Sequence, residues 1–333
     1  MSRKPAAAIE SHDLRIRVIA AMSEIAAADW DRCAGGGEMA GGPNPFTRHA
    51  FLAALETSKS ATARTGWQPQ HLVAESTDGT IIGVAPCYLK SHSRGEYVFD
   101  AGWADAYERA GGSYYPKLQV SVPFTPATGR RLLVAPGQPA GVAEAALAQG
   151  LIALCKLCEA SSVHATFMTQ AEWDLLGQRG FLRRNDQQFH WENGGFSCFE
   201  DFLAALASRK RKVIKRERRE GLADGIKVDW LTGSDLTEAA WDAFFAFYTE
   251  TGSRKWGRPY LTRAFFSRLG ETMADQTVLI MAKRAGRYIA DPALRRAIDD
   301  YLARERAYVE AAGHELREAS PFRKDVAHED AGF

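Results

Sequence analysis

KLQVSVPFTP, residues 117–126, is the stretch from which the fold class of this chain follows. Apolar and polar side chains alternate along it, which predicts a half-buried central strand. The next residues, ATGRRLL (127–133), form a glycine-containing loop that leads into a long helix, where Leu147, Leu151 and Leu154 share one face. A strand connected through such a loop to a helix indicates an α/β (mixed α+β) fold.

Elements of both kinds surround this strand. Before it we expect a strand within residues 13–25, two helices, the second capped by Thr47, and a β-hairpin whose turn is Asp78–Gly79. After the long helix we expect a strand at VHATFMT (163–169), a short helix that stops at Gly180, and a strand at FLRRNDQQFHW (181–191).

The second half of the chain repeats part of this pattern. GIKVDWLT (225–232) predicts a strand, and a helix capped by Ser234 or Asp235, a helix capped by Thr262 and a hairpin at 277–290 follow. The two hairpins, LVAESTDGTIIGVAP and LIMAKRAGRYIADPA, share a strand, a glycine turn and the start of a return strand. This faint internal repeat predicts two related units in tandem.

A strongly basic window, SRKRKVIKRERRE (208–220), lies between the two halves. The net charge of the whole chain is only +1, so the window is a local feature of a balanced sequence. Five apolar residues in and before it fall on one helical stripe: Phe202, Leu203, Leu206, Val213 and Ile214. The window is therefore either a solvated amphipathic helix that joins two domains, or a cationic surface for a phosphate-bearing partner such as tRNA, through residues 209–219.

Length and composition exclude several classes of protein. The 333 residues favour two domains, and 46% hydrophobic residues suffice for a globular core. We find no secretory h-region and no apolar run of bilayer length, and the five cysteines show no disulfide rhythm, so we expect a cytoplasmic protein without a membrane span. Cys155 and Cys158 lie in a helical pattern without a second ligand pair, so we expect no metal site.

Four longer strings resemble the FemAB-like family of predicted N-acyltransferases, which belong to the GNAT superfamily: NPFTRHAFLAALE, YYPKLQVSVPFTPATGRRLL, FHWENGGFSCFEDFLAALASRKRKVIKRERR and SPFRKD. The resemblance implies a tandem GNAT-like fold and transfer of an acyl or aminoacyl group to an amine in peptidoglycan precursor metabolism. It also implies acyl-CoA or aminoacyl-tRNA as a donor substrate and no permanently bound cofactor. The alternatives are a non-catalytic recognition protein that keeps this scaffold, and a nucleic-acid module that uses the basic helix.

The sequence departs from the family pattern after Ala290. In the family, the second hairpin continues into further strands and a helix, whereas GRYIA passes here directly into DPALRRAI, where Asp291–Pro292 begins a helix. We therefore expect a complete first unit and a truncated second unit, in which activity is lost or weakened by the deletion. The expected divisions are a disordered N-terminus (1–12), a first GNAT-like domain (13–198), a basic connecting helix (199–224), a truncated second domain (225–290), a C-terminal helix (291–325) and a disordered tail (326–333).

The glycine loop after the central strand is the candidate site for the donor. Gly129 allows close approach of a phosphate to the backbone, and Arg130 and Arg131 supply positive charge. An exposed turn with two solvated arginines is the competing interpretation.

The string SYYPKLQ gathers the candidate substrate-binding residues Tyr114, Tyr115, Lys117 and Gln119. Tyr115 could donate a proton to a leaving group, Lys117 could steer an anion, and His190 in FHWEN could act as a base. The competing interpretations are tyrosines that pack at a strand edge and a histidine that is part of the core. The catalytic base stays unknown at this stage.

Overall fold

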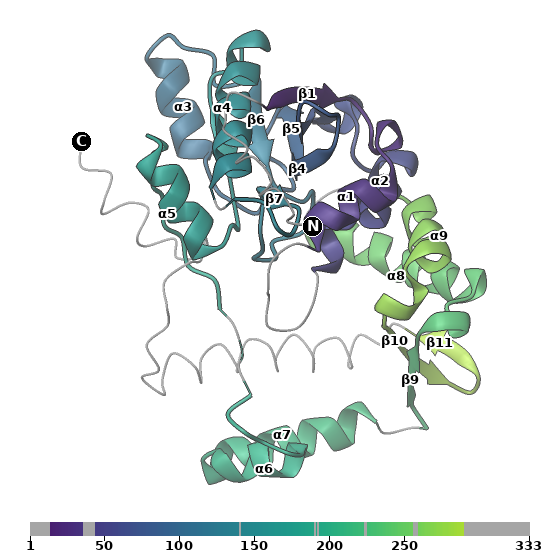
Figure 1. Ribbon diagram of the computed structural model, residues 1–333. Helices are drawn as coiled ribbons and strands as arrows, with labels where there is room; N and C mark the ends of the chain where they lie inside the picture. Colours follow the sequence, from purple (N-terminus) through teal and green to yellow (C-terminus); the bar gives the residue numbers. More distant parts are fainter. Residues whose placement is uncertain are drawn as a thin grey trace, which may run out of the picture. The chain divides into compact units, whose positions relative to one another are not determined.

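A computed structural model of the protein describes residues 14–35, 44–139, 141–189, 191, 193–222, 225–255 and 259–289. The chain is divided into two compact units, one made of residues 1–183 and 252–277, the other of residues 184–251 and 278–333. Figure 1 shows helices and strands throughout, and the α/β (mixed α+β) class is confirmed. The predicted terminal segments and the junction at Ala290–Asp291 lie outside the described residues.

The first unit contains two four-stranded sheets. One has the order β1-β3-β4-β7 and the other β2-β5-β6-β8, and all neighbours are antiparallel except β6 and β8. The strands are β1 (Arg15–Ile19), β2 (Trp67–Pro69), β3 (His71–Glu75), β4 (Ile81–Ala85), β5 (Cys87–Lys90), β6 (Lys117–Val120), β7 (Leu133–Val134) and β8 (Val163–Ala165). Only Pro86 separates β4 from β5, so the chain passes from one sheet to the other at a residue without an N–H group.

The β3–β4 hairpin confirms the predicted turn. Gly79 has a φ of 83°, in the left-handed region where a residue without a Cβ is favoured. The Asp78 carboxylate accepts a hydrogen bond of 2.9 Å from the Thr80 amide and one of 2.6 Å from the Ser76 hydroxyl. The turn chemistry that the sequence predicted is thus the chemistry that closes the hairpin.

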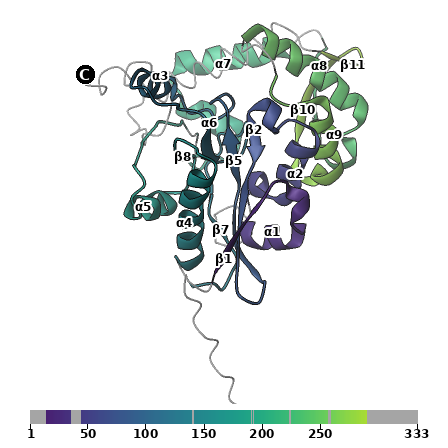
Figure 2. The ribbon, with the colours of Figure 1, turned by 90° about the horizontal axis from the view of Figure 1, so that it is seen from above.

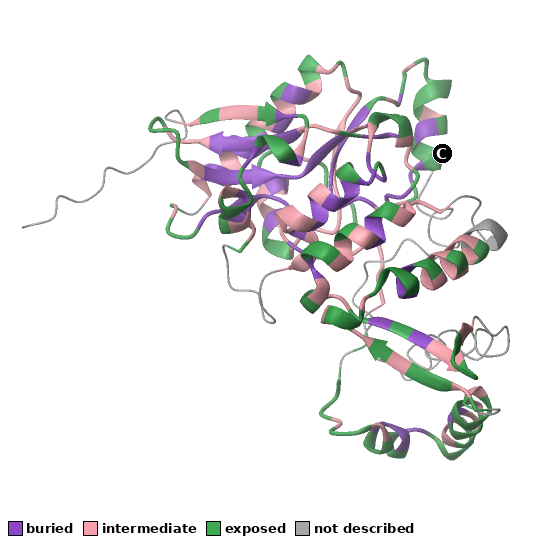
Figure 3. Ribbon diagram, turned by 90° about the vertical axis from the view of Figure 1, so that its right-hand side faces the viewer, coloured by how far each residue is buried: buried purple, intermediate pink, exposed green. Residues whose placement is uncertain are grey.

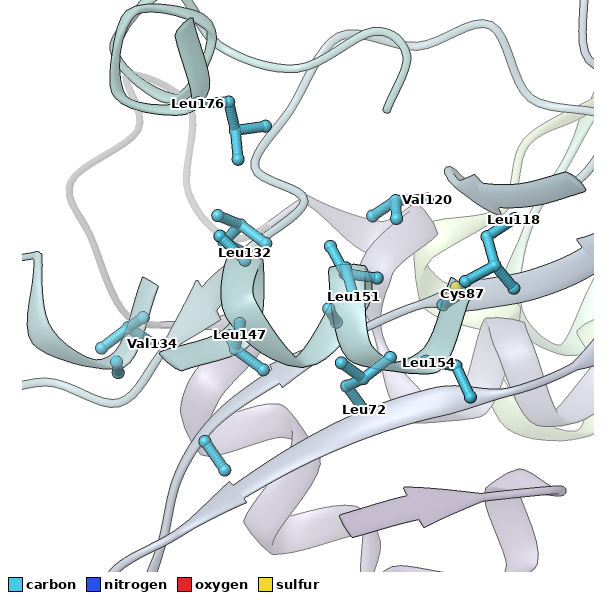
Figure 4. Close-up of a cluster of buried hydrophobic side chains, with 14 of the residues drawn as sticks. Leu72, Cys87, Leu118, Val120, Leu132, Val134, Leu147, Leu151, Leu154 and Leu176 are labelled. Atoms are coloured by element: carbon cyan, nitrogen blue, oxygen red, sulfur yellow. The ribbon is translucent and has the colours of Figure 1, made fainter. Parts of the chain in front are cut away.

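Helices cover both faces of the strands of this unit, as Figure 2 shows, with α4 on one side and α1 and α2 on the other. They are α1 (Ala27–Ala34), α2 (His49–Thr57), α3 (Ala101–Arg109), α4 (Val142–Leu157), α5 (Gln170–Gln178) and α9 (Arg263–Thr272). Leu147, Leu151 and Leu154 of α4 are buried against β3, β4 and β6, in the cluster of Figure 4. The predicted apolar face of this helix is confirmed.

Two strand predictions in this unit are wrong in extent or kind. The central strand ends at Val120 rather than residue 126, because residues 121–128 leave the sheet and Pro123 and Pro126 have no N–H group to donate. Its four residues are also all buried, so both of its faces are covered. Residues 181–189 join none of the sheets apart from an isolated bridge at Gln187.

In the second unit, the described residues form two short helices, a longer helix and a three-stranded sheet. They are α6 (Phe199–Ala205), α7 (Ser208–Gly221), α8 (Glu238–Lys255), β9 (Lys227–Leu231), β10 (Leu279–Arg284) and β11 (Arg287–Ile289), and the sheet order is β11-β10-β9, all antiparallel. Short 3-10 turns complete the two units: Met22–Glu24, Pro45–Thr47, Ala63–Thr65, Gly233–Asp235 and Ala274–Gln276. Among the described residues, none of the helices combines the length and apolar character that a bilayer crossing requires.

Two helix boundaries in the second unit differ from the prediction. The connecting helix expected over 199–224 is two helices, because Leu206 is extended (φ −80°, ψ 150°) and turns its side chain into a cluster with Phe202 and Ile214. The cap of α8 is Thr237 rather than Ser234 or Asp235, since its hydroxyl accepts a hydrogen bond of 3.3 Å from the Ala240 amide.

Candidate functional site

The face of sheet β2-β5-β6-β8 that points away from α4 carries polar side chains. In register, Tyr88 lies opposite Gln119 and Lys90 lies opposite Lys117, so these four side chains share one face of the sheet. The alternate residues face α4 and belong to the apolar core: Cys87, Leu89, Leu118 and Val120. The β5–β6 pair is therefore apolar on one side and charged on the other, although both sides are buried.

Lys117 is the centre of this charged face. Its ammonium donates hydrogen bonds of 2.8 Å to Ser93 Oγ and to Glu96 Oε2, and a further one to Asp100 Oδ2. The lysine and both carboxylate side chains are at most 2% exposed. Ser93, Glu96 and Asp100 all come from the segment between β5 and α3, which therefore lies over the polar face.

Tyr114 and Tyr115 surround the same ammonium group. The Tyr114 hydroxyl donates to Asp100 Oδ2 at 2.8 Å, and the Tyr115 hydroxyl shares a hydrogen bond of 2.8 Å with Ser93. The centres of the two rings lie 5.4 and 5.8 Å from Lys117 Nζ. The structure thus brings together three of the residues that SYYPKLQ singled out as substrate-binding candidates.

The environment of the two carboxylates shifts their pKa values in opposite directions. Burial raises the pKa of Glu96 above its ordinary value, against the opposing effect of Lys117. Burial acts on Asp100 in the same sense, but the hydrogen bonds and charge of Lys117, with bonds from Ser93 and Tyr114, outweigh it and hold that pKa low. Lys117 thus favours the charged form of Asp100.

Lys90 is a second buried lysine on this face. Its Nζ lies 3.4 Å from the centre of the Trp67 ring, 3.4 Å from the Arg94 carbonyl oxygen and 3.7 Å from Glu96 Oε1. Burial lowers the pKa of Lys90 to about 7, and the charge of Lys117 acts in the same direction while Glu96 opposes it. A substantial fraction of Lys90 is therefore an uncharged amine at neutral pH, able to accept a proton.

Sequence reasoning missed Lys90, Glu96 and Asp100. The one available signal was Lys90 itself, because CYLK places a lysine at the end of a strand that is otherwise apolar or aromatic. The carboxylates stand in an irregular segment without a motif, and only the fold brings them to the lysines.

Gln119 lies one step further along the polar face. Its amide nitrogen donates to Thr166 Oγ1 at 2.8 Å, while its Oε1 is buried. Within the described part of the chain, Gln119 Oε1, Ser121 Oγ and Tyr88 OH are all buried without a hydrogen-bond partner. Buried polar atoms in proteins are almost always paired, so these three unpaired atoms are unusual.

In the loop predicted to hold donor phosphates, the side chain of Arg131 points into the protein. Arg131 is buried, and its guanidinium donates to the carbonyl oxygens of Ala127, Gly129 and Thr166 at 2.6, 3.2 and 2.9 Å. Burial lowers its pKa to about 10. Arg131 thus supports the loop from within and does not present its charge to solvent, while the half-buried Arg130 donates to the Leu132 carbonyl oxygen at 3.1 Å.

Gly129 is buried where the loop returns to the sheet. Its amide donates to the Phe167 carbonyl oxygen at 2.9 Å, and a Cβ at this position would lie 2.4 Å from Asn44 Nδ2. A larger residue here would therefore have to displace the end of the Asn44 side chain. Glu172 on α5 holds the next turn, because its carboxylate accepts from the amides of Arg131 and Leu132 at 2.7–3.0 Å.

The other singled-out residues are distributed as follows. His190 lies outside the described residues, so its predicted role as a base stays a prediction. Cys155 and Cys158 are free, half-buried thiols, and Cys155 donates to the Ala160 carbonyl oxygen at 3.2 Å. The basic window forms α7, in which Ile214 faces the small apolar cluster and most cationic side chains are exposed.

A family model described as FemAB-like, peptidoglycan biosynthesis/recognition, matches residues 21–292. The chain belongs to the FemAB-like family. Three of the four quoted strings lie within the matched residues and SPFRKD (320–325) lies outside them, so the resemblance is confirmed for the first three; the match includes every strand and helix of the polar face, from β2 to α5. No curated protein matches this FemAB-like chain.

Proposed function

We propose that this FemAB-like protein transfers an acyl or aminoacyl group to an amine of a peptidoglycan precursor, in the cytoplasm, where such activated donors are made. The observation that carries the proposal is the buried polar face of β5 and β6. It combines a fixed ion cluster around Lys117 with Lys90, an amine that is partly uncharged near pH 7. Acyl transfer to an amine needs both a fixed polar frame and a proton acceptor.

Each residue has a distinct part in the proposed reaction. The acceptor nitrogen attacks the carbonyl carbon of the donor, the C–N bond forms, and the bond to the donor's sulfur or oxygen breaks. Uncharged Lys90 takes the proton that the nitrogen loses, and this proton then passes to the leaving thiolate or alkoxide. Lys117 donates its N–H groups to three acceptors and thereby orients Glu96 and Asp100.

The separation of β6 and β8 supports a place for the donor in this proposal. The parallel pairing runs from Leu118–Val163 to Val120–Ala165, after which residues 121–128 leave the sheet. In a GNAT-like unit, this separation is where an acyl donor enters. The unpartnered Ser121 hydroxyl stands at that point and, with Gln119, supports a polar group of the donor or acceptor.

For the donor we propose an aminoacyl-tRNA, with α7 as its phosphate contact. Arg209, Lys212, Lys215, Arg216 and Arg219 are exposed along this helix. Clustered exposed cations attract a polyanion, and the tRNA backbone is a far larger polyanion than the phosphates of acyl-CoA.

The test measures transfer with both donors. Purified protein is incubated with an aminoacyl-tRNA or with acetyl-CoA and a muropeptide that bears a free amine, and the product is identified by mass spectrometry. We expect aminoacyl transfer that Lys90→Met reduces at least about 100-fold, the lower end of general-base effects. Lys156→Met, on the exposed side of α4, is the matched control and should leave the rate unchanged. Absence of product with both donors would overturn the proposal.

Recognition without chemistry is the second candidate function. It is favoured by the Lys117 cluster, in which the ammonium is held by three acceptors and is buried, as in a rigid binding frame. In that case muropeptide binding by calorimetry persists while no transfer is detected, and Lys90→Met leaves the affinity unchanged.

A further inference from the structure

The sheet of the second unit has one apolar face that is exposed. Val228 and Trp230 of β9 lie opposite Ala282 and Ile280 of β10, and Val278 precedes Ile280 by two residues, so all five side chains share a face. Trp230 is 69% exposed, Val278 57%, Ile280 52% and Val228 40%. Contiguous exposed apolar side chains of this size mark an interaction surface.

The opposite face of the same sheet is covered. Leu279 and Met281 alternate with the exposed residues of β10 and are only 6% and 3% exposed. Figure 3 shows buried and exposed residues in alternation at the start of β10. A face that is meant for solvent carries polar residues at the outer positions, whereas Val228, Trp230 and Ile280 are apolar, so this face is suited to burial as well.

The last residue of β11 has its side chain on this exposed face. Ile289 of β11 pairs with Ala282 and therefore points to the same side as Trp230 and Ile280. The sequence that follows lies outside the described residues, and in it Leu294, Ile298 and Leu302 recur every four positions. Such spacing places apolar side chains on one stripe of a helix.

The segment after β11 can reach the whole face. Leu294 follows Ile289 by five positions, a span of at most roughly 17 Å. Three strands that are spaced about 4.8 Å apart make a sheet only about 10 Å wide between its outer strands. A helix that starts near residue 291 can therefore return across β10 to β9 without a long connection.

Opposite charges on the sheet and on the segment after β11 favour the same contact. Arg284 and Arg287 pair across β10 and β11 and stand at the end of the exposed face, in line with Ala282 and Ile289. Two carboxylates, Asp299 and Asp300, follow Ile298 directly. A helix whose apolar stripe lies on the sheet would bring acidic residues at its flank toward these arginines, a favourable pairing at a partly solvated rim.

We propose that residues 291–316 bind as an amphipathic helix across the exposed face of β9, β10 and β11, with Leu294, Ile298 and Leu302 against Trp230 and Ile280. The inference is independent of the proposed transfer reaction, because it concerns how the second unit completes its core. The segment acts as the second helical layer of this sheet.

Cysteine cross-linking of the full chain tests the contact. In a Cys198→Ser background, which removes the exposed native thiol, Ile280→Cys is combined with Ile298→Cys and the protein is oxidised mildly. We expect an intramolecular disulfide, identified by mass spectrometry of peptides. The control pairs Ile280→Cys with Arg296→Cys, which lies on the opposite side of the expected helix, and should cross-link at least about tenfold more slowly.

Hydrogen exchange provides a second readout that does not need a disulfide. Leu294→Asp with Ile298→Asp should speed amide exchange in β9 and β10 and increase binding of an apolar dye, while exchange in β3 and β4 of the first unit stays unchanged. Arg296→Asp should alter neither. The proposal is overturned by exchange and dye binding that match the unsubstituted chain. A cross-link that forms between two chains overturns it as well, since the occupant would then be a second copy.

Discussion

At the scale of single residues, Lys117 and its two carboxylate partners form a unit that tolerates removal of one member poorly. Lys117→Met leaves Glu96 and Asp100 buried without their shared cation, so we expect the free energy of unfolding to fall by about 3–5 kcal/mol. Urea unfolding followed by circular dichroism measures the change. Adding Asp100→Asn and Glu96→Gln to Lys117→Met should recover part of it, and a loss under 1 kcal/mol for the single variant would contradict the ion-cluster account.

Lys90 makes stability depend on pH in a predictable direction. Its pKa falls from 10.5 to about 7 on folding. Between these values the unfolded chain binds more protons than the folded chain, so the Lys90 contribution to the free energy of unfolding rises with pH, by at most about 1.4 kcal/mol per pH unit. Lys90→Met removes this slope. The free energy of unfolding of the unsubstituted chain, minus that of Lys90→Met, should therefore increase from pH 7 to pH 9. Parallel pH curves of the two chains would show that Lys90 stays charged.

The residues of the site were predictable only where sequence neighbours remain neighbours in space. Tyr114, Tyr115 and Lys117 stand within four positions and meet around one ammonium group. Glu96 and Lys90 come from a different strand and loop, and their approach to Lys117 depends on the pairing of β5 with β6. Pattern reading gives no access to that pairing.

At the scale of elements, α6 and α7 bury their apolar side chains and expose their charged ones. Phe202 and Leu206 are buried in a small cluster, whereas Arg209, Lys212 and Arg216 are exposed. Leu206→Ala should lower the stability of the second unit by about 2–5 kcal/mol, measured by amide exchange in α6 and α7. Reversing the three charges should leave that exchange unchanged. Equal effects of both variants would mean that the helix faces are wrongly assigned.

The same three charges carry a separate prediction for RNA binding. Each phosphate contact that is lost removes about 0.9 from the slope of log affinity against log salt concentration for a duplex. Reversal of Arg209, Lys212 and Arg216 should therefore weaken tRNA binding and flatten its salt dependence by about two to three. Salt titrations of fluorescence anisotropy measure both quantities, and an unchanged slope would remove α7 from the RNA contact.

Helices were easier to predict than the ends of strands, for a physical reason. The stripe of Leu147, Leu151 and Leu154 repeats over several turns, so one misplaced residue does not hide it. The end of β6 at Val120 depends on where residues 121–128 part from β8, which alternation alone does not reveal. The break at Leu206 was hidden similarly, because a buried leucine suits a continuous helix and a kink equally well.

At the scale of the whole molecule, the repeated hairpins predicted two units in tandem, but nothing in the sequence indicated the membership of α9. Its buried residues Phe265 and Phe266 would suit packing in either unit. The structure assigns residues 252–277 to the first unit, so the chain passes between the units three times. A division of the sequence at a single linker would therefore separate α9 from the elements on which it packs.

The contact of α9 with α2 makes this arrangement testable. The rings of Phe51 and Phe265 meet edge to face with centres 5.7 Å apart, and Thr262 donates to the Ser58 carbonyl oxygen at 2.9 Å and to Ser60 Oγ at 3.1 Å. Phe265→Ala should thus lower the stability of the first unit by about 3–5 kcal/mol, because a buried aromatic ring is removed.

Amide exchange locates the effect of that substitution. Exchange should speed up in α2, some 200 residues away in the sequence, and stay unchanged in β9 and β10. Arg268→Ala, at an exposed position of α9, is the matched control and should change stability by less than about 0.5 kcal/mol. A fragment that ends at residue 198 lacks α9 altogether, so we expect it to show the fast α2 exchange of Phe265→Ala. Slow exchange of α2 in that fragment would show that α2 keeps its stability without α9, and the first unit would then end before the basic helix.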